Sequence, residues 1–111
     1  MKKYKYALAE EFHSFQGEGL YTGTQMKFIR LAYCNVGCPW CDTDYSPKYM
    51  RTAEQLLEDV YERHICVTGG EPLQQDLEEL IYAAASKDIL VHIETSGTIE
   101  LPGYAPNWVY F

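Results

Sequence analysis

The sequence has 111 residues, 47% of them hydrophobic and 14% aromatic, and we expect a single domain, residues 1–111, with a packed core. Its formal net charge of −7 argues against direct binding of nucleic acid, because phosphate contacts require clustered Lys and Arg side chains. The chain holds no run of about 18 apolar residues and no apolar leader after its first lysines, so we predict a cytoplasmic protein without a membrane partner.

A strand-forming segment, Met26 to Tyr33 (MKFIRLAY), leads directly into a loop with three cysteines. Gly37 and Pro39 prevent regular structure in that loop. We therefore expect the cysteines at the carboxyl end of a strand.

The next segment, TAEQLLEDVYERH (residues 52–64), is predicted to be a helix. Thr52 and Gln55 match the capping box that begins many helices. One helical face would carry four side chains, those of Leu56, Leu57, Val60 and Tyr61. A second amphipathic helix is predicted further along the chain from the i, i+3, i+4, i+7 pattern of Leu77, Leu80, Ile81 and Ala84.

Short apolar strands are predicted at ICV (residues 65–67) and ILVHI (residues 89–93), and NWVYF (residues 107–111) reads as the start of another. Because strands and helices alternate, we predict an α/β fold with right-handed crossovers and a parallel sheet. An edge strand exposes unpaired backbone groups, so we expect either a second chain or a longer form of this chain to cover residues 107–111.

Three unusual segments follow the predicted strands: the cysteine loop, TGGEP (residues 68–72) and ETSGT (residues 94–98). In parallel α/β folds, ligands bind beyond the carboxyl ends of the strands. We therefore expect these three segments to form one site.

The stretch CNVGCPWC places Cys34, Cys38 and Cys41 within one short loop. This C-x3-C-x2-C spacing lets three thiolates face one metal centre, iron or zinc, and leaves tetrahedral coordination one ligand short. From the spacing alone, an iron–sulfur cluster and a structural zinc are equally favoured.

The fourth ligand can be another cysteine, a histidine or a small molecule. Cys66 lies in a predicted apolar strand, where a free cysteine is usually a small core residue. His92 alternates with apolar residues and reads as a core histidine, while His64 ends the first predicted helix, where the helix dipole favours a cation. A metal centre with an open position is therefore the sharper hypothesis.

The cysteine spacing, with Trp40 before the last cysteine and GGEP after the next strand, resembles the radical S-adenosylmethionine (SAM) enzymes. In that family three cysteines bind a [4Fe-4S] cluster, and the methionine moiety of SAM chelates the fourth iron. The segments FHSFQGEGLYTG, FIRLAYCN, CDTDY, TGGEP and ETSGT are together similar to the 7-carboxy-7-deazaguanine synthase family, over the N-terminal half of its usual chain. The resemblance implies a partial (β/α) barrel, of which these residues would hold about four strands.

This resemblance assigns the cofactor contacts. The cluster would be held by Cys34, Cys38 and Cys41. Gly69 and Gly70 would let the backbone approach the SAM amino group, and Glu71 would accept a hydrogen bond from it. Further contacts to SAM are expected from Trp40, Glu94, Thr95 and Ser96. Thr43 is expected to help hold Mg²⁺, a cation that prefers oxygen ligands, and Asp42 is the alternative contact to the metal or to SAM.

It also assigns the substrate contacts, which would be Phe15, Gln16, Gly17, Glu18, Arg30 and Thr68. Glu18 would pair with a guanidine-like edge of a pterin, and the fork of donors on Arg30 suits a substrate carboxylate. As a strand residue, Arg30 can equally be an ion-paired surface side chain.

The implied reaction converts 6-carboxy-5,6,7,8-tetrahydropterin to 7-carboxy-7-deazaguanine with loss of ammonia, in 7-deazapurine (queuosine-type) biosynthesis. The implied partners are a flavodoxin- or ferredoxin-type reductant and a second copy of the chain. Two alternatives stay open: a small radical SAM activase of a glycyl-radical enzyme, and a non-catalytic zinc-binding module. The QGEG and CDT segments count against the activase.

Overall fold

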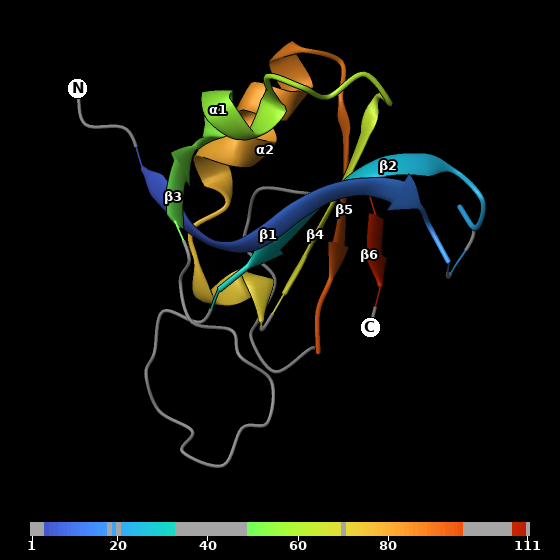
Figure 1. Ribbon diagram of the computed structural model, residues 1–111, viewed down its shortest axis with the longest axis horizontal. Helices are drawn as coiled ribbons and strands as arrows, with labels where there is room; N and C mark the ends of the chain where they lie inside the picture. The colour runs from blue at the N-terminus through green and yellow to red at the C-terminus, as the bar shows by residue number, and fades with distance from the viewer. Residues whose placement is uncertain are drawn as a thin grey trace.

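A six-stranded sheet organises the chain (Figure 1). The computed structural model describes residues 4–17, 19, 21–32, 49–69, 71–96 and 108–110. The strands are β1 (Lys5–Phe15), β2 (Gln25–Leu31), β3 (Tyr49–Thr52), β4 (His64–Gly69), β5 (Leu90–Glu94) and β6 (Trp108–Tyr110). They lie in the order β3-β1-β2-β4-β5-β6 across the sheet.

Four of these strands, β2, β4, β5 and β6, were predicted, and they are parallel to one another as expected. The two others, β1 and β3, were not predicted, and they extend the sheet with antiparallel pairings. Residues 7–11 of β1 (ALAEE) are weak strand formers, and β3 is only four residues long. The α/β class and the parallel core of the sheet are therefore confirmed, with an antiparallel extension at one edge.

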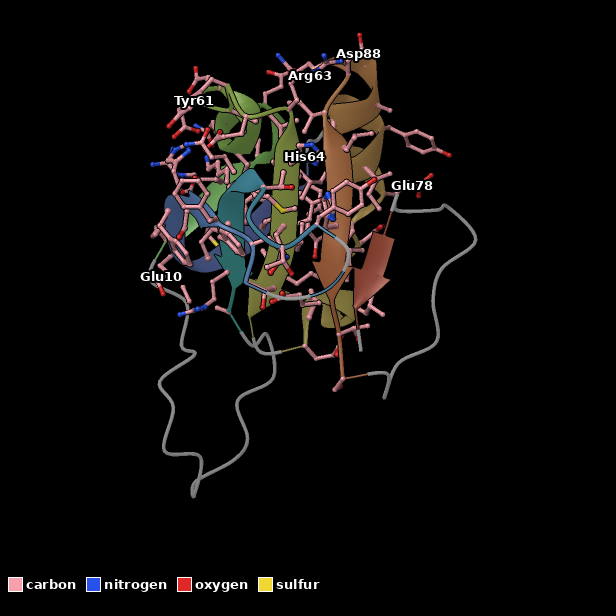
Figure 2. All side chains as sticks on the ribbon, turned by 90° about the vertical axis from the view of Figure 1, so that its right-hand side faces the viewer. Glu10, Tyr61, Arg63, His64, Glu78 and Asp88 are labelled. Atoms are coloured by element: carbon pink, nitrogen blue, oxygen red, sulfur yellow. The ribbon has the colours of Figure 1, made fainter. Side chains whose placement is uncertain are left out.

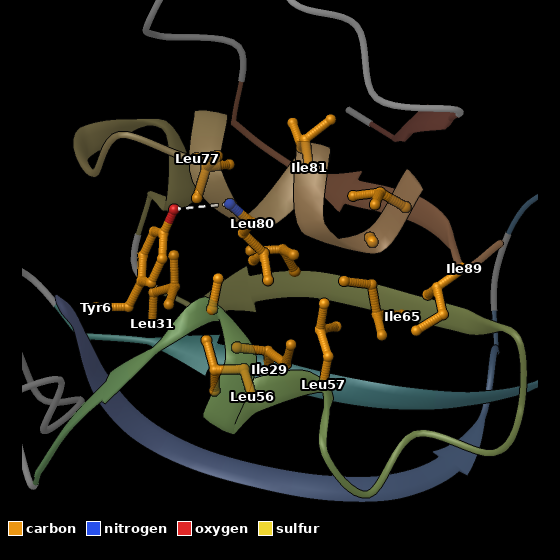
Figure 3. Close-up of a cluster of buried hydrophobic side chains, with 14 of the residues drawn as sticks. Tyr6, Ile29, Leu31, Leu56, Leu57, Ile65, Leu77, Leu80, Ile81 and Ile89 are labelled. Carbon is orange, nitrogen blue, oxygen red and sulfur yellow. Dashed lines mark hydrogen bonds between the residues drawn. The ribbon is translucent and has the colours of Figure 1, made fainter. Parts of the chain in front are cut away.

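Two α-helices, α1 (Ala53–Leu57) and α2 (Glu78–Ser86), cover one face of the sheet, and a short 3₁₀ helix, η1 (Pro72–Gln74), follows β4 (Figures 1 and 3). The predicted capping box is present, with the backbone N–H of Gln55 donating to Thr52 Oγ1 (3.3 Å) and that of Thr52 donating to Gln55 Oε1 (2.9 Å). No described helix is long and apolar enough to cross a membrane.

The first helix is shorter than predicted. It ends at Leu57 rather than at residue 64, so Tyr61 is 72% exposed and His64 is the first residue of β4 rather than the end of a helix. The backbone at Arg63 has φ of +67°, a left-handed conformation through which a right-handed helix does not continue. The second helix is as predicted, because all four residues of its expected apolar stripe are buried.

The main core lies between the helices and the sheet (Figure 3). Its buried side chains come from every layer and include Tyr6, Leu8, Ile29, Leu31, Leu56, Ile65, Val67, Leu77, Leu80, Val91 and Ile93. The hydroxyl of Tyr6 accepts a hydrogen bond from the backbone N–H of Leu80 at 3.1 Å, so the one polar atom of this ring is satisfied inside the core. A second, smaller cluster of Met26, Phe28 and Cys66 lies on the opposite face of the sheet.

One buried amide connects three segments that meet at the sheet edge. Gln75 is 4% exposed, and its Nε2 donates to the carbonyls of Ala7 (3.0 Å) and Ala32 (3.1 Å). Its Oε1 accepts from the backbone N–H of Ala7 at 3.0 Å. Since buried backbone groups require partners, this side chain fixes the segment after η1 against β1 and against the end of β2.

A histidine joins β1 to the segment between α1 and β4. His13 contacts two carboxylates, with Nδ1 bonded to Glu62 and Nε2 lying 3.1 Å from Asp59. The hydrogen bond to Glu62 raises the pKa of His13 against the opposing effect of burial, and Asp59 raises it further. The protonated imidazole therefore stabilises this connection.

We predict a corresponding pH dependence of stability. Because the folded pKa of His13 lies above its ordinary value of 6.5, the stabilisation is complete below that pH and disappears as the pH rises through the folded pKa. Urea denaturation of the parent chain and of His13→Gln should show a difference in unfolding free energy that is largest near pH 6 and shrinks toward about pH 9. Ser14→Ala, an exposed neighbour, should follow the parent, and a constant difference for His13→Gln would contradict the prediction.

Candidate functional site

The carboxyl ends of the parallel strands meet at one edge of the sheet, toward the bottom of Figure 1. Leu31 ends β2, Gly69 ends β4 and Glu94 ends β5. Two of the three segments that were expected to converge there, TGGEP and ETSGT, are joined by direct hydrogen bonds. The expected convergence is confirmed for these two segments, and their role as a binding site stays a prediction.

The joining group is the carboxylate of Glu71, a residue that is 8% exposed. Its Oε1 accepts from Thr95 Oγ1 (2.6 Å) and from the backbone N–H and the hydroxyl of Ser96 (both 2.8 Å). Its Oε2 accepts from the backbone N–H of Leu73 at 2.9 Å. Burial alone would raise the pKa of Glu71, but these donors lower it, so the group is an anion that fixes the two strand ends.

This arrangement changes the interpretation of Glu71. A carboxylate has about four acceptor positions, and four donors of the protein itself occupy Glu71 here. The role that the structure gives this side chain is to brace TGGEP against ETSGT. A direct bond from Glu71 to the SAM amino group stays a prediction, and so do contacts from Glu94 and Ser96.

A steric constraint explains why residue 69 is a glycine. Its φ is +140°, and a Cβ atom placed on it would lie 2.2 Å from the carbonyl oxygen of Leu31 and 2.7 Å from the nitrogen of that residue. Any other residue would therefore force the ends of β2 and β4 apart. The glycine keeps adjacent the two strand ends that lead into the cysteine loop and into TGGEP.

Eight predicted site residues lie outside the described residues: Glu18, Cys34, Cys38, Trp40, Cys41, Asp42, Thr43 and Gly70. The described backbone of β2 continues to Ala32, two positions before Cys34 in the sequence. Three cysteine thiolates are the soft donors that an iron–sulfur cluster requires, so the donor set fits that group.

The sheet face opposite the helices is called the open face here, and no helix covers it among the described residues (Figure 1). Adjacent strands in register present their side chains to the same face. Phe28 pairs with Cys66, Arg30 with Thr68, and Cys66 with His92. The open face therefore carries Glu10, Phe12, Met26, Phe28, Arg30, His64, Cys66, Thr68, His92 and Glu94.

Three predicted substrate residues lie on or against this face. Arg30 forms an ion pair with Glu10 and lies over the ring of Phe12, 5.6 Å from its centroid. Thr68 is the register partner of Arg30. Gln16 is 3% exposed, and its Nε2 donates to Cys66 Sγ at 3.7 Å.

The two remaining described members of that set are more peripheral. Phe15, the last residue of β1, is 61% exposed, and Gly17 is exposed with open space where a Cβ atom would lie. Their contact with a substrate stays a prediction.

The sequence interpretation missed a pair of histidines on the open face. His64 Nδ1 and His92 Nε2 are 3.0 Å apart, and the ring of Tyr21 contacts both histidines. Burial lowers the pKa of His92 to about 4, with His64 adding to the effect, and burial likewise lowers the pKa of His64. The pair is therefore neutral near pH 7, with one ring nitrogen donating to the other. The alternation of His64, Cys66 and Thr68 along one strand was the signal available in the sequence.

Burial raises the pKa of the Cys66 thiol to about 12, with the nearby Glu94 adding to the shift. The thiol therefore stays protonated at neutral pH. This confirms the prediction that Cys66 is a buried core residue.

A shallow cavity of about 590 Å³ lies at the other end of the strands. Its lining includes Arg63, His64, Asp88 and Leu90, around the beginnings of β4 and β5. It is therefore remote from the carboxyl edge that carries the predicted chemistry.

Comparison with known proteins gives three findings. A family model described as "Radical SAM superfamily" matches residues 28–108. The chain is 39% identical to a 7-carboxy-7-deazaguanine synthase of Synechocystis sp., covering 94% of this chain and 53% of the relative, and 41% identical to one of Flavobacterium psychrophilum, covering 91% and 50%. The crystal structure of QueE from Escherichia coli superposes with a TM-score of 0.78 at 32% identity, over 95% of this chain and 59% of that chain. The chain thus spans about half the length of the curated relatives it matches.

We predict that the two glycines Gly69 and Gly17 differ sharply in their tolerance of alanine. Gly69→Ala should reduce the free energy of unfolding by roughly 3 kcal/mol or more, because the new methyl group would overlap the backbone of Leu31. Gly17→Ala, with open space at that position, should change it by less than about 0.5 kcal/mol. Chemical denaturation of both variants measures this, and equal stabilities would show that the close approach of β2 and β4 does not constrain the fold.

Proposed function

This chain belongs to the radical SAM superfamily, and from that membership we propose that it acts in the conversion of 6-carboxy-5,6,7,8-tetrahydropterin to 7-carboxy-7-deazaguanine. The observation that carries the proposal is the position of Arg30 and Thr68, side by side on the open face near its carboxyl edge, with Gln16 packed against the same face. These residues come from three segments that were matched independently to the substrate contacts of the synthase family. The named relatives support the same assignment.

The cysteine segment and the neighbouring loops would hold the cofactors. A [4Fe-4S] cluster on Cys34, Cys38 and Cys41, with SAM at its open iron position, would supply the hydrogen-abstraction chemistry that begins the ring contraction. Thr43, with Mg²⁺, would orient the substrate carboxylate. The described residues contribute the Glu71 brace, which joins the segment after β4 to the segment after β5.

The open face provides the substrate contacts. The guanidinium of Arg30 presents two parallel donors to a carboxylate, and the ring of Phe12 below it fixes its plane. The buried amide of Gln16 and the carboxylate of Glu18 would recognise the guanidine-like edge of the pterin. Beneath these groups, Met26 and Phe28 are buried in an apolar cluster against which Phe12 and Tyr21 pack.

A flavodoxin- or ferredoxin-type reductant and a homodimer belong to the same proposal, as does use of the product in queuosine-type 7-deazapurine biosynthesis. They rest on the resemblance to the synthase family. No observation on the described residues favours the glycyl-radical activase or the zinc module.

The proposal predicts a cluster whose spectrum responds to SAM. The chain should be reconstituted anaerobically with iron and sulfide, reduced, and measured by electron paramagnetic resonance with and without SAM. We expect a [4Fe-4S] signal that SAM changes, followed by formation of 7-carboxy-7-deazaguanine and ammonia from the carboxylated tetrahydropterin. A zinc-loaded chain that is indifferent to SAM would overturn the proposal.

Two cysteine variants make this test specific. Cys38→Ala should abolish the cluster signal, since it removes one of three thiolate ligands. Cys66→Ala should retain the signal, because this thiol is buried on the open face and protonated at neutral pH. Loss of the cluster in both variants would instead indicate a general failure to fold.

A further inference from the structure

The segment that connects β1 to β2 folds back over the open face. The backbone N–H of Gln16 donates to the carbonyl of Thr24 (2.9 Å), and that of Gly23 donates to the carbonyl of Gln16 (2.7 Å). Figure 2 shows this segment crossing in front of β4 and β5. Gln16, one of the proposed substrate residues, therefore lies against β4, the strand that carries His64 and Cys66.

Two side chains hold the segment against the sheet. Gln16 reaches Cys66 Sγ, as described above. Tyr21 packs against the cluster of Met26, Phe28 and Cys66, and its ring meets His92 edge-on, with centroids 5.1 Å apart and an interplanar angle of 77°. The ring of His64 lies 5.8 Å from that of Tyr21. Thr24 links the two residues, because its carbonyl accepts from Gln16 N–H (2.9 Å) and its N–H donates to the Tyr21 carbonyl (3.0 Å), so the support of Tyr21 bears on the position of Gln16.

The support is the histidine pair. The bond between His64 and His92 connects β4 to β5 through their side chains, and His92 is fully buried. His64 also lines the cavity at the other end of the strands.

The order of residues along the strands shows how far the histidine pair lies from the carboxyl edge of the sheet. On β4, His64 precedes Cys66, and Thr68 follows at the carboxyl end. On β5, His92 precedes Glu94 in the same way. A ligand that enters from the carboxyl edge and contacts Thr68 would therefore meet Gln16 and Tyr21 next. The ring of Tyr21 in turn packs against the two histidines.

We propose that Tyr21, seated on the His64–His92 pair, is the floor of the substrate pocket, holding Gln16 in place and limiting how deeply a planar bicyclic heterocycle enters. Tyr21 and the two histidines are positioning residues in this arrangement. The inference rests on the proposed function, because it assigns the specificity of that same site.

The first test measures whether Tyr21 holds the segment between β1 and β2 in place, and it does not require enzymatic turnover. Hydrogen exchange of the backbone amides of Gln16 and Gly23, followed by NMR, reports whether the segment stays closed. Tyr21→Ala should accelerate exchange at both amides by ~10-fold or more and leave Leu80 in the core unchanged, whereas Tyr21→Phe should retain the parent rates. Tyr82→Ala, which removes an exposed tyrosine from α2, is the matched control.

The second test uses the reconstituted chain and its proposed substrate. Tyr21→Ala should raise KM for 6-carboxy-5,6,7,8-tetrahydropterin by ~10-fold with a smaller change in kcat, and Tyr21→Phe should restore the parent KM. A second substrate is an analogue methylated on the 2-amino group, at the edge assigned to Gln16. The ratio of its kcat/KM to that of the normal substrate should be higher for Tyr21→Ala than for the parent chain. His92→Leu should shift KM in the same direction as Tyr21→Ala.

The outcomes separate the two proposals. Unchanged amide exchange in Tyr21→Ala, or faster exchange with an unchanged KM and an unchanged preference between the two substrates, overturns the floor while leaving the proposed function intact. Absence of turnover by the parent chain, in the presence of a SAM-responsive cluster, overturns the assigned substrate and with it the specificity role of Tyr21. In that case the exchange result still shows whether Tyr21 supports the segment.

Discussion

The carboxylate of Glu71 is the interaction on which the carboxyl edge of the sheet depends. It joins the segment after β4 to the segment after β5 by accepting three hydrogen bonds from Thr95 and Ser96, and it accepts a fourth from Leu73 in its own segment. A buried anion is costly unless it is fully hydrogen-bonded, and Glu71 meets that condition. The pKa of Glu71 is lowered because the hydrogen-bond donors outweigh the effect of burial. Beyond the last paired residues of β4 and β5, these bonds connect the two strand ends.

The two faces of the sheet serve different purposes, and the two-residue period of the strands separates them. On β4, Ile65 and Val67 enter the main core, while Cys66 and Thr68 face the opposite side. The helix-covered face can therefore be purely apolar. The open face can carry histidines, a carboxylate and an arginine without weakening the core, because its polar groups are paired with one another.

Much of the parallel sheet could be predicted because its signals are local. The stripe on α2 and the apolar strands follow from periodicity, and the three strand-end segments follow from the rule that parallel strands end together. The start of α1 was also predictable, since its capping box uses only Thr52 and Gln55. Its end was not, because Asp59 is held by Lys27 and His13 from strands distant in the sequence. For the same reason β1, with its ALAEE run, is a strand only because β2 and β3 pair with it.

The sequence was enough to name candidate site residues, but it did not predict which residues they contact. Resemblance assigned Glu71 to SAM, but its actual donors depend on which strand lies beside β4. The His64–His92 pair escaped notice because each histidine has an ordinary structural interpretation when taken alone. Only the register of β4 against β5 brings them together.

The two cations of β2, Lys27 and Arg30, differ in how much free energy it would cost to remove their partners. Lys27 is 1% exposed, and its ammonium is bonded to Leu56 O (2.6 Å), Glu11 (2.7 Å) and Asp59 (2.5 Å), so removing those partners would leave a buried charge at a cost of about 3–5 kcal/mol. Arg30 lies on the opposite face, and both it and Glu10 are well exposed, with side-chain exposures of 39% and 50%. An exposed ion pair of this kind contributes at most about 1 kcal/mol. A ligand carboxylate can therefore displace Glu10 from Arg30 at little cost, whereas no ligand could displace the partners of Lys27. Of the two cations, only Arg30 is available for binding.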